Sequence, residues 1–229
     1  MTNAHALIFT GGNRPHSAAE HIYSPHSLVI AADSGFDNAR RAGKTPHVLI
    51  GDMDSISPQH LAEAEASGIE VIRHPSDKDK TDTELALELA IERGKSFLTV
   101  ISGGGDRLDH VLGFMHSAAR FAGGDVFVDL LIGTAQIDIV APEQWHTIVV
   151  GEQPIVSLIP LGGPARGVST ERLTWELDND ILLPFHSRGV SNVALDTSFN
   201  IHITDGVLAV VQPYFFDPDI DTVTPGGLN

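Results

Sequence analysis

The chain has 229 residues, of which 42% are apolar, 30 are Asp or Glu, 14 are Lys or Arg and none is Cys. The lack of Cys excludes disulfides, thiolate zinc sites and cysteine nucleophiles, and the formal net charge of −16 argues against nucleic acid or anionic lipid as partners. Because no apolar run reaches the ~20 residues of a membrane span, and the first residues do not resemble a secretory signal, we expect a cytoplasmic protein.

Up to about residue 131 the chain alternates β-rich runs with helix-like segments. The expected strands are residues 7–10, 28–32, 48–50, 69–72, 97–101 and 126–131. The expected helices are residues 36–42, 58–67, 83–93 and 109–121. Strands that are apolar throughout are typical of a parallel sheet covered on both faces. This half therefore predicts an open, doubly wound α/β domain.

Beyond residue 140 the pattern changes to short alternating runs with no convincing helix. These runs are residues 147–150, 155–159, 173–177, 201–203 and 207–211, and Gly, Pro, Asn and Asp separate them. Such a pattern is typical of a compact antiparallel sandwich or barrel. With a boundary at Ala141-Pro142, we expect two domains, residues 1–140 and residues 141–229.

Four of the expected strands end directly in a polar, acidic or glycine-rich segment. In chain order, the segments are Asp33-Ser34-Gly35, Gly51-Asp52-Met53-Asp54-Ser55, residues 76–82 and residues 102–107. The carboxyl ends of parallel strands share one edge of the sheet, which is where ligands bind. We therefore expect these four segments to line one cleft.

The residue types in these segments indicate a particular ligand. Asp residues without His or Cys partners are hard oxygen ligands, which favour Mg²⁺. Lys78, Lys80 and Arg107 provide cations for phosphate groups, and the glycines allow the backbone to approach closely. Together, the segments are typical of a site for a Mg-bound nucleotide.

Each segment also has a purely structural interpretation. Residues 33–35 form a common turn and helix cap, residues 76–82 a solvated loop that caps the next helix, and residues 102–107 a flexible turn. Asp52 and Asp54 are more specific, because two carboxylates at i and i+2 after a buried strand can face the same way.

These motifs, in this order and approximate spacing, resemble the thiamine pyrophosphokinase family. The resemblance is carried by Asp33-x-Gly35, Gly51-Asp52-x-Asp54-Ser55, Lys78-Asp79-x-Thr81-Asp82 and Arg107-Leu108-Asp109-His110. In the second half, residues 167–177 and Ser191-Asn192 resemble the thiamine-binding β-domain of that family. The resemblance covers most of the chain and implies a Rossmann-like catalytic domain followed by a β-sandwich.

The family resemblance implies transfer of a diphosphate group from ATP to the hydroxyethyl group of thiamine, giving thiamine diphosphate and AMP. It also implies a homodimer whose active sites lie between subunits, so that an aromatic residue of one β-domain covers thiamine bound at the other catalytic domain.

Roles for individual residues follow from this resemblance. Asp52, Asp54 and one or both of Asp79 and Asp82 are expected to hold Mg²⁺, while Lys78 and Arg107 clamp phosphate oxygens. The nucleotide is expected to contact Asp33, Gly35, Ser55, Thr81, Gly104, Gly105 and Asp109. No single residue stands out as a general base. The candidate for this role is an Asp near the hydroxyl group of thiamine.

For thiamine, Trp175 is expected to stack on the rings, and Ser191 or Asn192 to bond the pyrimidine. The alternative for Trp175 is a place in the β-domain core. The sequence departs from the family pattern at Ser34, Asp106, Phe114 and Arg172.

Two other functions stay open. One is a Mg-dependent diphosphokinase for another small alcohol, such as a pterin, against which Trp175 and Ser191-Asn192 argue. The other is a sensor that binds nucleotide or thiamine without catalysis, against which the number of Asp residues argues.

Overall fold

The computed structural model describes residues 4–21, 26–105, 107–142 and 144–216. Asp106, one of the departures from the family pattern, lies outside the described residues. Within the described ranges, every helix is too short or too polar to span a bilayer.

The helices are η1 (Ser17–Glu20), α1 (Gly35–Arg41), α2 (Pro58–Ala66), α3 (Asp82–Glu92) and α4 (Leu108–Ala119). The strands of the first half are β1 (His5–Phe9), β2 (Leu28–Ala32), β3 (Val48–Gly51), β4 (Glu70–Arg73), β5 (Phe97–Ser102), β6 (Phe127–Ile132) and β7 (Ala135–Val140). Those of the second half are β8 (His146–Val149), β9 (Ile155–Pro160), β10 (Ala165–Glu171), β11 (Asp180–Leu182), β12 (Asn192–Val193), β13 (Ser198–His202) and β14 (Leu208–Gln212).

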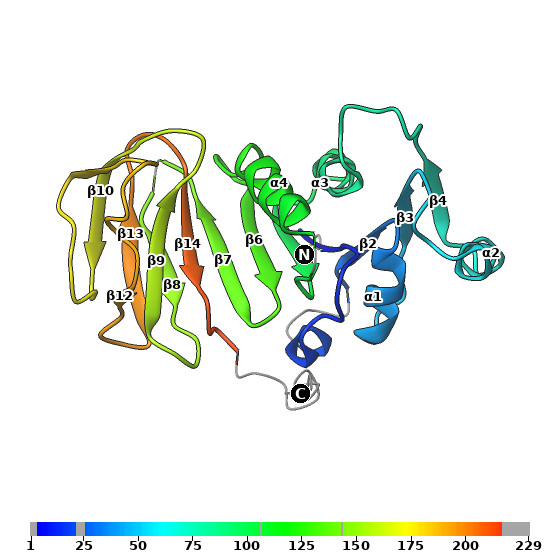
Figure 1. Ribbon diagram of the computed structural model, residues 1–229, viewed down its shortest axis with the longest axis horizontal. Helices are drawn as coiled ribbons and strands as arrows, with labels where there is room; N and C mark the ends of the chain where they lie inside the picture. Colours follow the sequence, from blue (N-terminus) through cyan, green and yellow to red (C-terminus); the bar gives the residue numbers. More distant parts are fainter. Residues whose placement is uncertain (1–3, 22–25, 106, 143, 217–229) are drawn as a thin grey trace, which may run out of the picture.

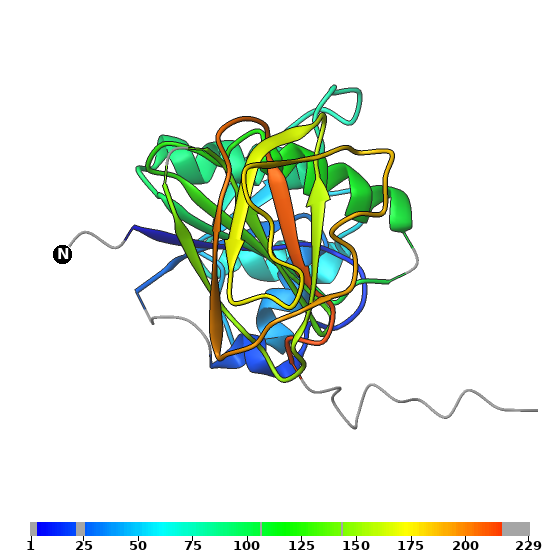
Figure 2. The ribbon, with the colours of Figure 1, turned by 90° about the vertical axis from the view of Figure 1, so that its left-hand side faces the viewer.

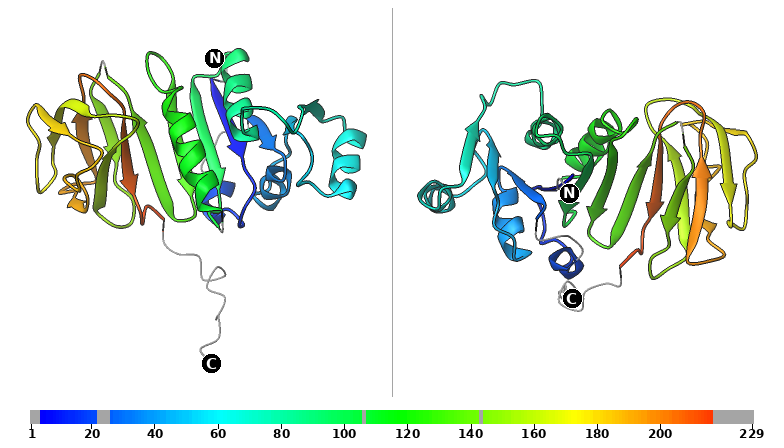
Figure 3. Two further views of the ribbon diagram at one scale, coloured as in Figure 1. Left: turned by 45° about the horizontal axis from the view of Figure 1, so that its top comes forward. Right: turned by 180° about the vertical axis from the view of Figure 1, so that it is seen from behind.

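A ten-stranded mixed sheet organises the molecule, in the order β12-β9-β14-β7-β6-β5-β1-β2-β3-β4 (Figures 1 and 3). The six neighbouring strands β6, β5, β1, β2, β3 and β4 pair in parallel. The remaining strands of this sheet, β7, β14, β9 and β12, pair antiparallel with their neighbours. Successive residues of a buried strand point to opposite faces. Thus Ile30 of β2 joins the core beneath α3 and α4, and Val29 joins the core beneath α1. The α/β class predicted from sequence is confirmed.

Every strand and helix predicted in the first half is present, with ends shifted by at most two residues, whereas η1 and β7 were not predicted. Local signals explain this agreement. Pro58 opens α2, where the Ser57 hydroxyl accepts a hydrogen bond from the His60 N–H, and the Thr81 hydroxyl caps α3 by accepting from the Glu84 N–H.

A second sheet, in the order β11-β10-β13-β8, packs against the antiparallel end of the large sheet (Figure 2). Phe199 and Ile201 of β13 share a core with Leu158 of β9 and Val210 of β14. The large sheet crosses the predicted boundary, because β7 pairs with β6 on one side and with β14 on the other. The division into two domains at residue 140 stays a prediction.

The strand predicted at residues 173–177 is wrong. The strand of this region is β10, which ends at Glu171, and the chain then turns at Arg172, whose φ of +64° is left-handed. The Arg172 N–H donates to Glu176 Oε1 and closes the turn. Leu173 and Leu177 are buried, while Trp175 is 61% exposed. The alternation of apolar and polar residues over 173–177 therefore arises from a loop that two buried leucines anchor to the core.

Two carboxyl groups face each other across β6 and β7, where Asp129 is the register partner of Asp138. The Thr99 hydroxyl donates to Asp129 and the Gln136 amide donates to Asp138. Burial raises the pKa of Asp129 to about 7, with the charge of Asp138 adding to the effect. Burial likewise raises the pKa of Asp138 to about 6.

This pair predicts a loss of stability as pH rises. Because the folded-state pKa values lie above the unfolded value, the stabilising contribution is complete below about pH 4 and is lost as pH rises to about 7. Asp138→Asn removes one charge, so we expect its melting temperature to exceed that of the wild type by roughly 3–6 °C at pH 8, and by less at pH 5. Thermal unfolding at both pH values measures this. An equal difference at the two pH values would contradict the prediction.

Candidate functional site

The carboxyl ends of β1, β2, β3 and β5 open onto a cleft of about 570 Å³, together with the first turns of α3 and α4. All four polar segments identified in the sequence contribute to its lining, so their predicted convergence is confirmed. The predicted site residues that line the cleft are Asp33, Asp52, Asp54, Ser55, Lys78, Thr81, Asp82, Gly104, Gly105, Arg107 and Asp109.

Three predicted residues of the first half do not line this cleft. Lys80, expected to provide a cation for phosphate, instead pairs with Glu88, its Nζ 2.7 Å from Glu88 Oε2. Asp79 is exposed on the loop before α3. Gly35 is buried at the start of α1, where a Cβ atom would collide with the carbonyl oxygen of Phe9. Gly35 therefore allows α1 to pack closely against β1.

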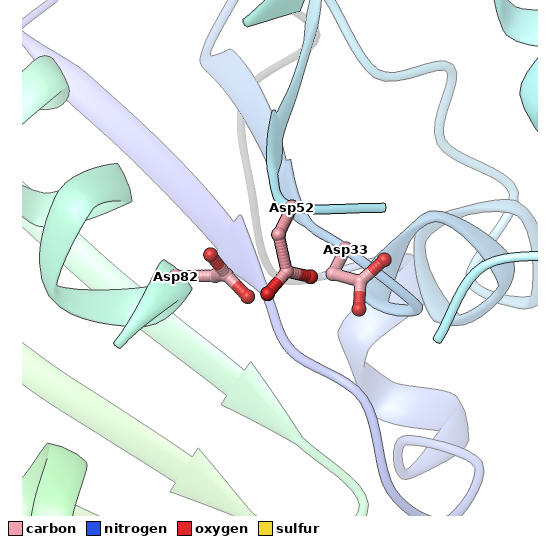
Figure 4. Close-up of side chains that lie close together, drawn as sticks. All are labelled: Asp33, Asp52 and Asp82. Atoms are coloured by element: carbon pink, nitrogen blue, oxygen red, sulfur yellow. The ribbon is translucent and has the colours of Figure 1, made fainter. Parts of the chain in front are cut away.

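The centre of the cleft is acidic. Asp33 follows β2, Asp52 follows β3 and Asp82 begins α3, and each contributes a carboxylate oxygen within 4.8 Å of the others (Figure 4). Gly51 makes this approach possible. Its φ is +149°, and a Cβ atom there would lie 3.0 Å from Asp82 Cγ and 3.2 Å from Asp33 Cβ. We call Asp33, Asp52 and Asp82 the acidic centre.

Lys78 is the cation nearest to this group among the described contacts, with its Nζ 3.1 Å from Asp82 Oδ1 and 3.4 Å from Asp52 Oδ2. Burial works against charge on Lys78, but the carboxylates of Asp82 and Asp52 outweigh it and raise its pKa. Burial also opposes ionisation of Asp52, yet the Asp54 N–H and Lys78 outweigh it and lower the Asp52 pKa. Lys78 and Asp52 are therefore both charged at neutral pH.

Asp82 and Asp33 show the opposite effect. Burial raises the pKa of Asp82, with the charges of Asp52 and Asp54 adding to it and Lys78 opposing it. Burial also raises the pKa of Asp33, against the hydrogen bonds from Ser55. In both groups the ionised form is therefore less favoured than in a free Asp side chain. Oxygen donors alone, with Asp54 on the same cleft wall, suit a hard divalent cation such as Mg²⁺.

Another part of the cleft rim carries glycines and an arginine. Gly104 and Gly105 have φ values of +73° and +136°, and the Gly104 N–H donates to Ser102 Oγ. Arg107 makes two hydrogen bonds to Asp109, Nε to Oδ1 at 2.9 Å and Nη2 to Oδ2 at 2.8 Å, which lower the Asp109 pKa against a smaller desolvation effect. A guanidinium at this rim can bind phosphate oxygens in bidentate fashion.

A fifth loop, which was not predicted from the sequence, also reaches the cleft. Thr10, Gly11 and Gly12 follow β1 directly and also line the cleft. The buried Asn38 donates to the carbonyl oxygens of Thr10 and Asn13 at 2.9 and 3.1 Å, so it holds this loop. The signal was present in the sequence, because the run 7–10 ends in glycines just as the other four runs end in polar segments.

Two departures from the family pattern lie at the cleft. Ser34 lies against Gly11, where a Cβ atom would collide with the Ser34 Oγ. Phe114 of α4 is buried and contributes an apolar wall.

The residues expected to bind thiamine lie elsewhere. Trp175 and Asn192 line a separate pocket of about 430 Å³ beside Arg188 and Gly189. Trp175 is 61% exposed, so the alternative that it belongs to the core is wrong. Ser191 is exposed, with a φ of +60°. Because β10 and β12 lie across the molecule from β2 and β3, one chain does not bring Trp175 to the acidic centre (Figure 1).

Asn192 has a structural role in this pocket. Its side chain is buried, Oδ1 accepts from the Trp175 N–H at 3.1 Å and Nδ2 donates to the Trp175 carbonyl oxygen at 2.8 Å. Oδ1 also accepts from the Val193 N–H at 2.8 Å. Asn192 therefore fixes the backbone that presents the exposed Trp175 ring.

Comparisons with known proteins agree with this arrangement. The family model described as thiamin pyrophosphokinase, catalytic domain, matches residues 19–128, and the one described as thiamin pyrophosphokinase, vitamin B1 binding domain, matches residues 138–208. The chain is 29% identical over 143 residues to thiamine pyrophosphokinase 1 of rice, an alignment that covers 58% of this chain and 53% of the rice protein. The chain thus spans about half the length of that relative.

A bacterial relative is covered almost throughout. The chain is 22% identical to thiamine pyrophosphokinase of Bacillus subtilis, over 82% of this chain and 87% of the relative. The crystal structure of a Bacillus subtilis thiamine pyrophosphokinase has the same fold, with a TM-score of 0.78 at 23% identity, over 90% of this chain and 97% of that one. Since the two domain models of a single family match both halves in order, the chain belongs to the thiamine pyrophosphokinase family.

Proposed function

We propose that this chain transfers a diphosphate group from ATP to the hydroxyl group of thiamine, giving thiamine diphosphate and AMP. The observation that carries the proposal is the acidic centre beside Lys78, which lies in the part of the chain matched by the family's catalytic domain. We also propose that the chain works in the cytoplasm and has neither nucleic acid nor a membrane as a partner.

In this proposal Asp52 and Asp82 hold Mg²⁺, and Asp54 faces it from the same cleft. The ion, when bound, would neutralise charge on the triphosphate and on the departing AMP. Lys78 and Arg107 bind phosphate oxygens, and the glycine loops after β1 and β5 let backbone N–H groups approach them. Asp79 as a further ligand stays a prediction.

The thiamine hydroxyl oxygen attacks the β-phosphorus of ATP, and the bond from that phosphorus to the α–β bridging oxygen breaks. The hydroxyl proton is lost in this step, and an Asp of the cleft is the candidate acceptor. The protein contributes mainly by positioning both substrates and by stabilising charge.

We further propose a homodimer in which Trp175 of the partner subunit stacks on thiamine beside the acidic centre. The exposure of Trp175, and the distance across the fold between its pocket and the acidic centre, support this arrangement. The partner's Ser191 would lie near the same ring system.

The products of an incubation with ATP, Mg²⁺ and thiamine test the proposed reaction. We expect AMP and thiamine diphosphate in equal amounts, separated by chromatography. Release of ADP would contradict diphosphate transfer, and faster turnover of a pterin alcohol would favour the alternative substrate class. Thermal stabilisation by ATP or thiamine without any AMP would instead indicate a sensor.

A further inference from the structure

We infer that Asp33 is a positioning residue, whose carboxylate holds the loop of residues 52–56 in the shape that presents Asp52 to the cation. The family resemblance led us to expect that Asp33 contacts the nucleotide. We infer this positioning role in place of that contact. The inference deepens the proposed function, on which it rests.

The hydrogen bonds of the Asp33 side chain and of its N–H all point to the neighbouring strand and its loop. Its side chain is buried, Oδ2 accepts from the Ser55 N–H and Oδ1 accepts from the Ile56 N–H, both at 3.1 Å. The Asp33 N–H donates to the carbonyl oxygen of Ile50, at the end of β3. One residue after β2 thus ties both sides of the turn that follows β3.

The loop has an unusual path that needs such a tie. Met53 has a φ of +66°, which is unfavourable for a residue with a side chain, and Asp52 Oδ1 accepts from the Asp54 N–H. Met53 and Ile56 are buried against Phe36, so apolar contacts fix these two positions. Without Asp33, the N–H groups of Ser55 and Ile56 would lose their acceptors, which is costly for the buried Ile56 amide above all.

The surroundings of Asp33 also argue against contact with the nucleotide. Asp33 lies beside Asp52 and Asp82. Its carboxylate is the third negative group at this point and would repel the phosphate oxygens of a nucleotide. Its two oxygens are already directed at backbone donors. Residues that orient metal ligands in this way commonly change metal affinity 10–100-fold when they are replaced.

Asp33→Asn tests the inference on the chain without nucleotide. Asn tolerates the φ of +47° at this position, but its NH₂ group places a donor opposite one of the two N–H groups. We expect amide hydrogen exchange at Ser55 and Ile56 to accelerate about tenfold or more without metal. Binding of Mn²⁺, followed by electron paramagnetic resonance, should weaken roughly 10–100-fold.

Asp52→Asn is the matched control, since its side-chain oxygen still accepts from Asp54. It should weaken Mn²⁺ binding and leave exchange at Ser55 and Ile56 as in the wild type. In the AMP assay, Asp33→Asn should raise the half-saturating Mg²⁺ concentration much more than it lowers kcat at saturating Mg²⁺. If Asp33 had a purely structural role, its replacement would lower thermal stability without raising the half-saturating Mg²⁺ concentration more than it lowers kcat.

Unchanged exchange at Ser55 and Ile56 in Asp33→Asn would overturn the inference, as would lost protection with wild-type Mn²⁺ affinity. If Asp33→Asn does not fold, hydrogen exchange of the wild-type chain without metal decides the question. Exchange at the Ser55 and Ile56 amides that is slower than in an unfolded chain supports their hydrogen bonds to Asp33. Exchange at the rates of an unfolded chain overturns the inference. Exchange and Mn²⁺ binding need neither ATP nor thiamine. A chain that makes no AMP would therefore refute the proposed reaction and leave this test intact.

Discussion

Asp52→Asn is expected to lower the rate of AMP formation roughly 100-fold or more at saturating ATP and thiamine. The substitution removes a charged oxygen from the acidic centre and one of the two carboxylates that hold Lys78. The fold should persist, because Asn keeps the oxygen that accepts from the Asp54 N–H. Initial rates at several Mg²⁺ concentrations, with circular dichroism as a check on folding, measure the effect.

Asp77→Asn is the matched control, because Asp77 is an exposed Asp of the neighbouring acidic segment, residues 76–82, and does not line the cleft. We expect it to retain the wild-type rate. Asp79→Asn, made in parallel, decides whether Asp79 contributes a ligand as the sequence suggested. A folded Asp52→Asn protein with the wild-type rate would refute the assignment of Asp52 to the metal site.

The strands and helices of the first half can be predicted because their sequence signals are local. Buried parallel strands such as β2 and β3 are continuous apolar runs, and helix starts such as Ser57-Pro58 carry their own caps. The rule that the carboxyl ends of parallel strands share one edge then brings distant loops together without any knowledge of side-chain contacts. The convergence of Asp33, Asp52 and Asp82 follows from that rule.

What the sequence did not predict depends on contacts between distant segments. β7 alternates Gln136 and Asp138 with the buried Ile137 and Ile139, so it lacks the continuous apolar run of the parallel strands, and it pairs with β6 and β14. The hydrogen bonds of Asp33 to Ser55 and Ile56 likewise join residues more than twenty positions apart. Spacing places a carboxylate at a strand end but does not say which donors it faces.

Trp175→Ala is expected to raise the KM for thiamine about 2–30-fold and to leave the KM for ATP unchanged. The expected size follows from the roughly 0.5–2 kcal/mol of an aromatic ring stacked on a cation such as the thiazolium of thiamine. The chain offers a matched control in Trp145, its other tryptophan, which is half exposed and packs on His202. Trp145→Ala should leave both KM values unchanged. Equal losses for thiamine and ATP in Trp175→Ala would contradict a specific contact with thiamine.

The same variants test whether each active site draws on two subunits. Asp52→Asn and Trp175→Ala chains, co-expressed with different affinity tags and purified through both, give mixed dimers. At thiamine concentrations below the wild-type KM, each parent dimer has two damaged sites. A mixed dimer regains one intact site if Asp52 of one subunit works with Trp175 of the other, because one chain supplies the acidic centre and its partner supplies the ring. Its rate should then exceed those of both parents, whereas sites built from single chains would give only the mean of the two.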